Sequence, residues 1–277
     1  MVQRWGRYLF PLVLAVMQST AAHATTLPPV VYAAGSLRSG LDEIVARFAS
    51  RTGIKFDVSY QPSGKLRKDI ESGARPAAFA SASIAHTDAL FREGYLRNSV
   101  TFARNAMCLL AAPGVDLGQE DLLAKMLDPA LRLGTSTPQI DPAGDYAWQV
   151  FHKAEAVQSG AYDQLNLKAL QLVGNPAIAA QATRSVAQLL RDRQVDLFLT
   201  YCSYAEKTAI EVPGVTWRRL NDDLNVETSY GIGALSFADE RADRLINFIL
   251  SMEGQKILAK HGFAPVKSIP DTGSDQR

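Results

Sequence analysis

Two short segments near the start of the chain each place a serine where a β-like run gives way to a helical pattern. The first, residues 30–37, contains Ser36, and the second, residues 56–65, contains Ser63. A helix N-terminus presents unpaired N–H groups and the positive end of the helix dipole, and a serine there adds a hydroxyl donor. Two such helix starts that converge would hold a small anion without a metal ion or a buried lysine. The alternative is that each serine only caps its helix.

The elements that must position these serines alternate between strands and helices. This order predicts an open, mostly parallel sheet with right-handed connections. Ligands of such sheets bind at the carboxyl ends of the strands, where both serines lie. Strands are expected at residues 30–34, 55–60, 77–80, 102–112, 132–134, 170–173, 195–201, 216–220 and 230–236, and helices at 37–51, 64–72, 84–93, 120–127, 144–159, 186–193, 204–208, 240–250 and 253–261.

The apolar runs at 102–112 and 230–236 are long enough to pass from one domain into another. The sequence has no repeat, low-complexity tract or flexible linker that would join two domains as a tether. Strand-like crossings make good hinges for closure over a ligand. We therefore expect one lobe formed by residues 25–103 and 230–277 and a second lobe formed by residues 104–229.

Residues 1–24 have the pattern of a secretory signal peptide. Arg4 and Arg7 form a positive start, an apolar stretch follows at 9–17, and Ala-His-Ala at 22–24 matches a cleavage site. A buried N-terminal helix is the alternative. The cleavage point has no cysteine for a lipid anchor, so we expect a free, exported protein.

Charge and cysteine content narrow the possible partners. Cleavage would remove Arg4 and Arg7 and leave 27 basic residues against 28 acidic ones. This balance argues against nucleic-acid binding, which needs a basic surplus. The only cysteines, Cys108 and Cys202, favour a disulfide in an exported protein, with two buried thiols as the alternative.

An exported α/β hydrolase or transferase is the rival class of function. The sequence has no G-x-S-x-G, H-E-x-x-H or P-loop motif. After cleavage only His86, His152 and His261 remain, and none has metal-ligand spacing. We therefore expect a binding protein and not an enzyme, although a triad assembled in space stays open as an alternative.

Four segments in chain order carry a family pattern. Together they span almost the whole mature chain, at residues 31–37, 62–66, 141–147 and 195–205. With these segments the chain resembles the periplasmic molybdate-binding proteins of ABC importers. The resemblance implies a two-lobed α/β fold of the periplasmic-binding-protein type, with two open, mostly parallel sheets joined by crossing hinge strands and the anion in the cleft.

The same resemblance implies five oxyanion-binding positions. Ser36 and Ser63 would be the hydroxyl and backbone donors of the first lobe. Ala143 and Val186, each at a helix start, would donate backbone N–H groups from the second lobe, and Tyr201 would donate its phenol. The metal would be bound only as the central atom of the oxyanion. We therefore expect no side chain to coordinate it directly, and we expect no cofactor.

A site made only of donors discriminates between anions. Phosphate at neutral pH usually carries a proton, which such a site leaves without an acceptor. Molybdate and tungstate carry none, and charge-assisted hydrogen bonds are strong enough to hold them. Sulfate also carries no proton, so the site must reject it by size. Its bonds to oxygen are shorter than those of molybdate, so some donors of the site would not reach its oxygen atoms.

Two departures from the family pattern bear on the choice of anion. A related group binds its metal in six-coordinate form with two carboxylates, but here only Asp141 is present and Thr200 occupies the second position. We therefore expect tetrahedral binding, with Asp141 as a helix cap. The usual acidic residues near the third strand are replaced by Ser81 and Ser83, and we expect these two serines to cap the next helix. Arg184 lies either in the cleft, where it would raise the affinity for an anion, or on the solvated surface.

The function that follows is capture and delivery. We expect a periplasmic monomer that encloses molybdate, and tungstate as well, and then docks on the permease of an ABC importer. A receptor of the same fold for sulfate, a phosphonate or a metal-chelate anion is the alternative.

Overall fold

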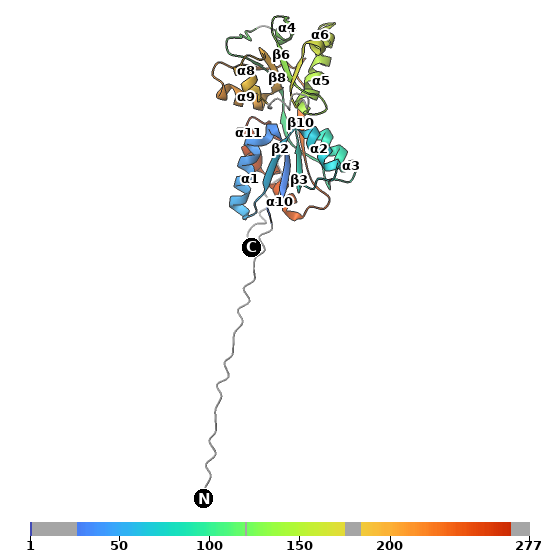
Figure 1. Cartoon of the computed structure of the whole chain (residues 1–277), viewed down its shortest axis with the longest axis vertical. Coiled ribbons are helices and arrows are strands. Elements are labelled where there is room, and N and C mark those ends of the chain that lie inside the picture. The colour runs from blue at the N-terminus through green and yellow to red at the C-terminus, as the bar shows by residue number, and fades with distance from the viewer. Residues whose placement is uncertain (2–26, 120, 175–183, 267–277) are drawn as a thin grey trace.

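The computed structural model describes residues 27–119, 121–174 and 184–266, together with Met1. These residues form two α/β lobes, one above the other in Figure 1, each built on a five-stranded sheet. The expected two-lobed fold is therefore confirmed. Apart from Met1, the expected signal peptide lies outside the described residues.

The first lobe is a sheet with helices on both faces. Its strands are β1 (Val30–Ala34), β2 (Asp57–Gln61), β3 (Ala78–Ser81), β4 (Val100–Asn105) and β10 (Thr228–Ala234). Its helices are α1 (Arg38–Thr52), α2 (Ser63–Glu71), α3 (Ile84–Arg92), α10 (Glu240–Leu250) and α11 (Met252–Lys260), with a 3-10 turn η1 (Gly35–Leu37) before α1. The strand order is β2-β1-β3-β10-β4, and β10 alone runs antiparallel to its neighbours.

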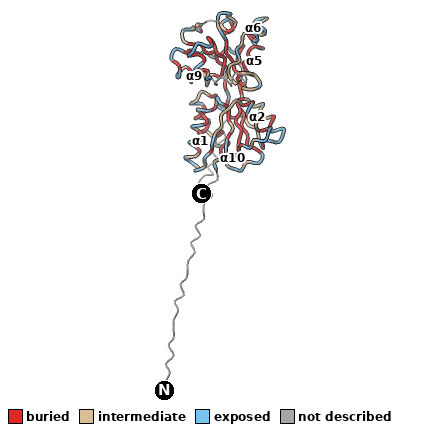
Figure 2. Tube along the Cα trace, viewed as in Figure 1, coloured by how far each residue is buried: buried red, intermediate tan, exposed pale blue. Residues whose placement is uncertain are grey.

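Alternation along the strands explains the two helical layers of this lobe. Successive strand residues face opposite sides of a sheet, so Ala78 and Ala80 join one core and Phe79 joins the other. The first core includes residues of α1, α10 and α11, and the second includes Leu66 of α2 and Leu90 of α3. Figure 2 shows buried residues running along the sheets of both lobes.

The second lobe repeats this topology. Its strands are β5 (Met107–Ala111), β6 (Leu133–Ser136), β7 (Leu170–Val173), β8 (Leu197–Tyr201) and β9 (Thr216–Arg219). Its helices are α4 (Leu122–Leu127), α5 (Pro142–Val157), α6 (Ala161–Lys168), α8 (Val186–Arg191) and α9 (Cys202–Glu211). In the order β7-β6-β8-β5-β9, β5 runs antiparallel to β8 and β9.

The structure corrects two expectations about secondary structure. The apolar run expected as one strand at 102–112 is two strands, β4 in the first sheet and β5 in the second. The chain changes sheets at Ala106, and the apolar pattern did not reveal this change because apolar residues continue on both sides of it, at Phe102 and Ala103 in β4 and throughout β5. Helix α6 was not expected, since it follows Gly160 and buries only Ala161 and Leu165.

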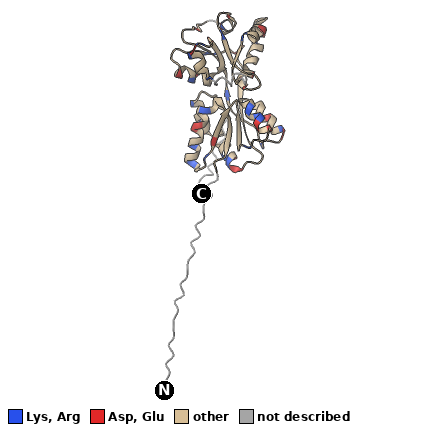
Figure 3. Ribbon diagram, viewed as in Figure 1, with Lys and Arg blue, Asp and Glu red and all other residues tan. Residues whose placement is uncertain are grey.

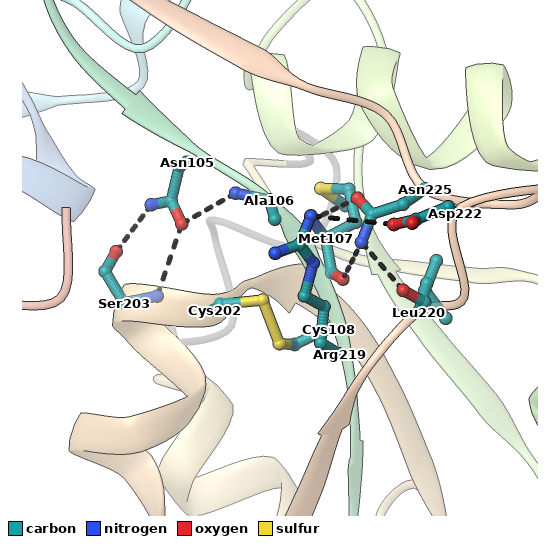
Figure 4. The surroundings of a disulfide bond; sticks show 10 residues. All are labelled: Asn105, Ala106, Met107, Cys108, Cys202, Ser203, Arg219, Leu220, Asp222 and Asn225. Atoms are coloured by element: carbon teal, nitrogen blue, oxygen red, sulfur yellow. Dashed lines mark hydrogen bonds and ion pairs between the residues drawn. A yellow bond between two sulfur atoms is a disulfide. The ribbon is translucent and has the colours of Figure 1, made fainter. Parts of the chain in front are cut away.

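A disulfide joins Cys108 of β5 to Cys202, the first residue of α9, with a Cα–Cα distance of 4.9 Å. The prediction of a bridge is confirmed. Figure 4 shows it beside the crossing between the lobes, near Asn105 and Ser203. The bridge fixes the residue that directly follows Tyr201.

Candidate functional site

A cavity of about 840 Å³ lies between the two lobes, at the carboxyl ends of their parallel strands. The last residues of β1, β2, β6, β7 and β8 all line it, as open α/β sheets predict. Ser36, Ser63, Ala143, Val186 and Tyr201, the five residues singled out from the sequence, line it as well. The structure thus brings together residues that are far apart in the chain.

Ser36 and Ser63 approach the cavity from the first lobe, and neither side chain caps its helix. Ser63 is buried at the first position of α2, and its Oγ accepts a hydrogen bond from the Ala82 N–H at 3.1 Å. Ser36 lies in η1, where its Oγ is 3.2 Å from the Tyr230 hydroxyl. Because a hydroxyl has one proton and two lone pairs, Ser63 keeps its proton for another acceptor.

Tyr201 ends β8 and is 2% exposed. Its hydroxyl is buried and has no hydrogen-bond partner within the described part of the chain. The rings of Tyr146 and Tyr230 hold it in place, at centroid distances of 6.1 and 5.5 Å. Burial and nearby charges raise the pKa of Tyr201 well above its ordinary value, so the phenol is neutral and keeps a proton to donate.

The second lobe contributes two helix starts. Ala143 is the second residue of α5, and its N–H donates to Asp141 Oδ1 at 3.1 Å, so this donor already has an acceptor. Val186 is the first residue of α8, which begins with a capping box between Ser185 and Gln188.

Asp141 caps α5, as expected, and it also lines the cavity. Burial raises the pKa of its carboxyl to about 6, against the opposing effect of hydrogen bonds from the Ala143 N–H and Ser136. The charge of Asp145 raises it further. An ionisable carboxyl therefore lies among the proposed anion donors.

Sequence reasoning missed the lysines of the cavity wall. Lys65 and Lys68, on the first turns of α2, and Arg184 all line the cavity. Lys65 pairs with Asp69 at 2.7 Å, and Arg184 lies 3.9 Å from Asp192. The signal for the lysines was present, because both lie within the helix that was expected to follow Ser63. Together these cations offset the charge of Asp141 and favour an anionic ligand.

Ser81 and Ser83, at the departure from the family pattern, are not among the residues that line the cavity. Ser81 Oγ accepts from the Ser83 N–H at 3.0 Å. Ser83 is the N-cap residue of α3, but its side chain makes no capping hydrogen bond, so the capping expected for it is not seen. Its hydroxyl interacts with Tyr146 instead.

The backbones of the two lobes meet beside the cavity. The Gly64 N–H of α2 donates to the Ile140 carbonyl oxygen at 3.1 Å. A Cβ at position 64 would lie 2.5 Å from the Gln139 carbonyl oxygen, so only glycine permits this approach.

Within residues 27–119, 121–174 and 184–266 there is no group of three or more His, Cys, Asp or Glu side chains arranged to hold a metal ion. No helix in this part of the chain is long and apolar enough to cross a membrane. Figure 3 shows acidic and basic residues mixed along the helices of the first lobe, in agreement with the near-neutral charge.

Comparison with solved structures supports the fold. The periplasmic molybdate-binding protein of Azotobacter vinelandii superposes with a TM-score of 0.70 at 20% identity, covering 86% of this chain and 99% of that one. The sulfate-binding protein SubI of Mycobacterium tuberculosis superposes with a TM-score of 0.71 at 14% identity, covering 86% of this chain and 87% of that one. At such low identities these likenesses concern the fold alone.

Sequence comparison identifies the family. An uncharacterized protein of Pasteurella multocida is 30% identical over 246 residues, which are 85% of this chain and 98% of that protein. The sequence profile of the bacterial extracellular solute-binding proteins matches residues 29–264. Proteins of this family and fold are substrate-binding components of transporters and not enzymes. The chain therefore belongs to the bacterial extracellular solute-binding protein family.

Proposed function

We propose that this protein captures a tetrahedral oxyanion, molybdate or tungstate, between its lobes and delivers it to the permease of an ABC importer in the cytoplasmic membrane. Substrate-binding proteins of this family deliver small ligands to such permeases. The proposed location is the periplasm, reached through the signal peptide at residues 1–24.

The observation that carries the proposal is the Tyr201 hydroxyl, which is buried, neutral and without a partner in the described structure. Buried polar groups are nearly always hydrogen-bonded, so an exception at a cavity points to a ligand that completes it. Ser63 lines the same cavity, and its Oγ accepts from the Ala82 N–H while its own proton stays available for a ligand. Donors that converge in this way suit an anion without a proton.

Isothermal titration of the mature protein with molybdate, tungstate, sulfate and phosphate tests the choice of anion. We expect tight one-to-one binding of molybdate and tungstate and much weaker binding of the other two. Tight binding of sulfate or phosphate alone would contradict the proposal.

The variant Ser36→Ala/Ser63→Ala tests the site itself. We expect molybdate affinity to fall at least about tenfold, because two hydrogen bonds to a charged group are lost. The matched control is Ser50→Ala/Ser72→Ala, at two exposed positions of the same lobe. Unchanged affinity in the site variant, with the melting temperature preserved, would remove both serines from the site.

A receptor for a phosphonate is the second candidate, and the size of the cavity favours it. A volume of about 840 Å³ lies in the range of cavities that hold organic ligands. Lys65 and Lys68 add positive charges to the cavity wall. An oxyanion bound at the hydroxyl groups expected from the sequence would not need them. Titration with methylphosphonate beside molybdate distinguishes the two candidates.

A further inference from the structure

The lining of the cavity changes in character with depth. Ser63 and Tyr201, at 0% and 2% exposed, bring neutral hydroxyl groups to it. Lys65, Lys68 and Arg184 line the same cavity, but all three residues are exposed to solvent. The cavity therefore has a buried inner end with neutral donors and a solvent-facing outer end with cations.

Two of the three cations at the outer end lie near acidic partners. Lys65 pairs with Asp69 at 2.7 Å, and Arg184 lies 3.9 Å from Asp192. Lys68 has no ion pair with any residue in the described part of the chain. It is therefore the cation that can pair with a ligand without giving up an existing contact.

The sequence of α2 explains why Lys68 is left unpaired. Residues three and four positions apart are neighbours on a helix surface, and around Lys68 the one acid at these spacings is Glu71, which pairs with Arg67 at 2.6 Å. Lys68 follows Ser63 by five residues, which corresponds to about 7.5 Å along the helix axis. This spacing and the difference in exposure place the Lys68 ammonium group apart from an anion held at the Ser63 hydroxyl.

The second lobe adds an apolar wall to the cavity. Ile140, Leu172 and Val173 are half-buried and line it. Ile140 lies beside the end of β7, because a Cβ added at Gly174 would be 3.4 Å from Ile140 Cγ2. Such a wall offers an oxygen atom no hydrogen bond and suits the carbon atoms of a ligand. The cavity, at about 840 Å³, is also far larger than four oxygen atoms around one central atom can fill.

We propose that Lys68 forms a second anion subsite at the outer end of this cavity, so that the protein also binds organic anions with two acidic groups. The oxyanion group of such a ligand binds at the hydroxyls of the inner end, its carboxylate pairs with Lys68, and a short carbon chain lies along the apolar wall. This inference rests on the anion site of the proposed function and extends its ligands from inorganic oxyanions to organic ones that carry a carboxylate.

Isothermal titration with two phosphonates of equal carbon number tests the second subsite. Propylphosphonate and 3-phosphonopropionate both have three carbons, but the second ends in a carboxylate where the first ends in a methyl group. We expect the mature protein to bind 3-phosphonopropionate at least about tenfold more tightly than propylphosphonate, because the carboxylate gains a charge-assisted hydrogen bond.

Lys68→Met is the variant that isolates the subsite, because methionine keeps a long unbranched side chain and removes the charge. At about 0.15 M salt, where charges more than about 8 Å apart are largely screened, we expect this variant to bind the two phosphonates within about twofold of each other. Its molybdate affinity should change by less than about twofold for the same reason. Lys55→Met is the matched control, since Lys55 is an exposed lysine of the same lobe that does not line the cavity.

Equal affinity of the wild type for the two phosphonates, or no binding of 3-phosphonopropionate, would overturn the inference. A preference for 3-phosphonopropionate that persists in Lys68→Met would overturn it too. So would an equal loss of molybdate and 3-phosphonopropionate affinity in this variant, because Lys68 would then contact the oxyanion itself. Failure of the wild type to bind molybdate would count against the proposed function alone, since the two phosphonates are compared without it.

Discussion

The hydroxyl groups of Ser36, Ser63 and Tyr201 are among those that line the cavity, and Asp141 adds an ionisable carboxyl to the lining. The hydroxyl groups stabilise an anion as donors, whereas an ionised carboxyl repels it. Since both act in a partly desolvated space, their effects are larger than they would be in water. Anion binding and protonation of Asp141 are therefore expected to be linked.

The linkage predicts that molybdate binding tightens as pH falls from about 8 to about 6. Burial raises the pKa of Asp141 to about 6, so the carboxyl is ionised at the upper end of this range and gains a proton toward the lower end. Asp141 interacts with the titratable groups of Asp145, Tyr201, Tyr204 and Tyr230. The cations of the same cavity wall are Lys65, Lys68 and Arg184. A bound dianion raises the pKa further, so binding takes up protons. Isothermal titration at several pH values measures the trend.

Asp141→Asn should remove this pH dependence and tighten binding at the alkaline end, because asparagine caps helices as well as aspartate does and carries no charge. Asp121→Asn is the matched control, since Asp121 caps α4 in the same way and does not line the cavity. If the variant showed the same slope as the wild type, the slope would have another origin.

At the scale of elements, local patterns predicted the structure better than long-range ones. β1 and α10 have the expected bounds, 30–34 and 240–250, because alternation and helical spacing are properties of neighbouring residues. The break at Ala106 and the packing of Tyr230 behind Ser36 depend on strand pairing between distant segments. Ser36 and Ser63 stood out from the residue pattern as serines at helix starts, and the family resemblance added Ala143, Val186 and Tyr201. Ala143 and Val186 could come only from the resemblance, because a backbone donor leaves no side-chain signal.

The disulfide has a predicted role at this scale, because it ties β5 to the first residue of α9. Cys108→Ser/Cys202→Ser should lower stability by about 2–4 kcal/mol through the long loop that the bridge closes. It should also weaken anion binding, since Tyr201 directly precedes Cys202. Thermal unfolding and titration measure the two effects. An unchanged melting temperature, or two free thiols in the unfolded and unreduced wild type, would contradict the role.

At the scale of the whole molecule, the chain crosses twice between the two lobes. The chain leaves the first sheet through β4 and enters the second as the antiparallel β5, and it returns through β9 into the antiparallel β10. An asparagine stabilises the backbone at each crossing: Asn105 bonds Ala106 and Ser203, while Asn225 Oδ1 accepts from the Met107 N–H at 3.1 Å. Because the crossings are held in this way, we expect relative motion of the lobes to be confined to few residues.

Such a hinge predicts that the fit between the lobes at Gly64 controls ligand retention. In Gly64→Ala the added Cβ would lie 2.5 Å from the Gln139 and 2.9 Å from the Ile140 carbonyl oxygens, which are backbone atoms of the opposite lobe. The lobes must then stay further apart, so donors from the two sides cannot all reach one anion. We expect molybdate affinity to fall at least about tenfold through faster dissociation, measured by stopped-flow release.

Small-angle X-ray scattering tests whether Gly64→Ala loses molybdate affinity because its lobes cannot close. The wild type should become more compact on addition of molybdate, and Gly64→Ala should remain at the dimensions of the ligand-free protein. Gly40→Ala is the matched control: it is also a helical glycine of the first lobe, and its Cβ would make an ordinary contact with Leu258 at 3.5 Å. If Gly64→Ala bound molybdate as tightly as the control and compacted to the same degree, the Gly64–Ile140 contact would not be part of the ligand-bound arrangement, and closure would have to occur about another line of contact between the lobes.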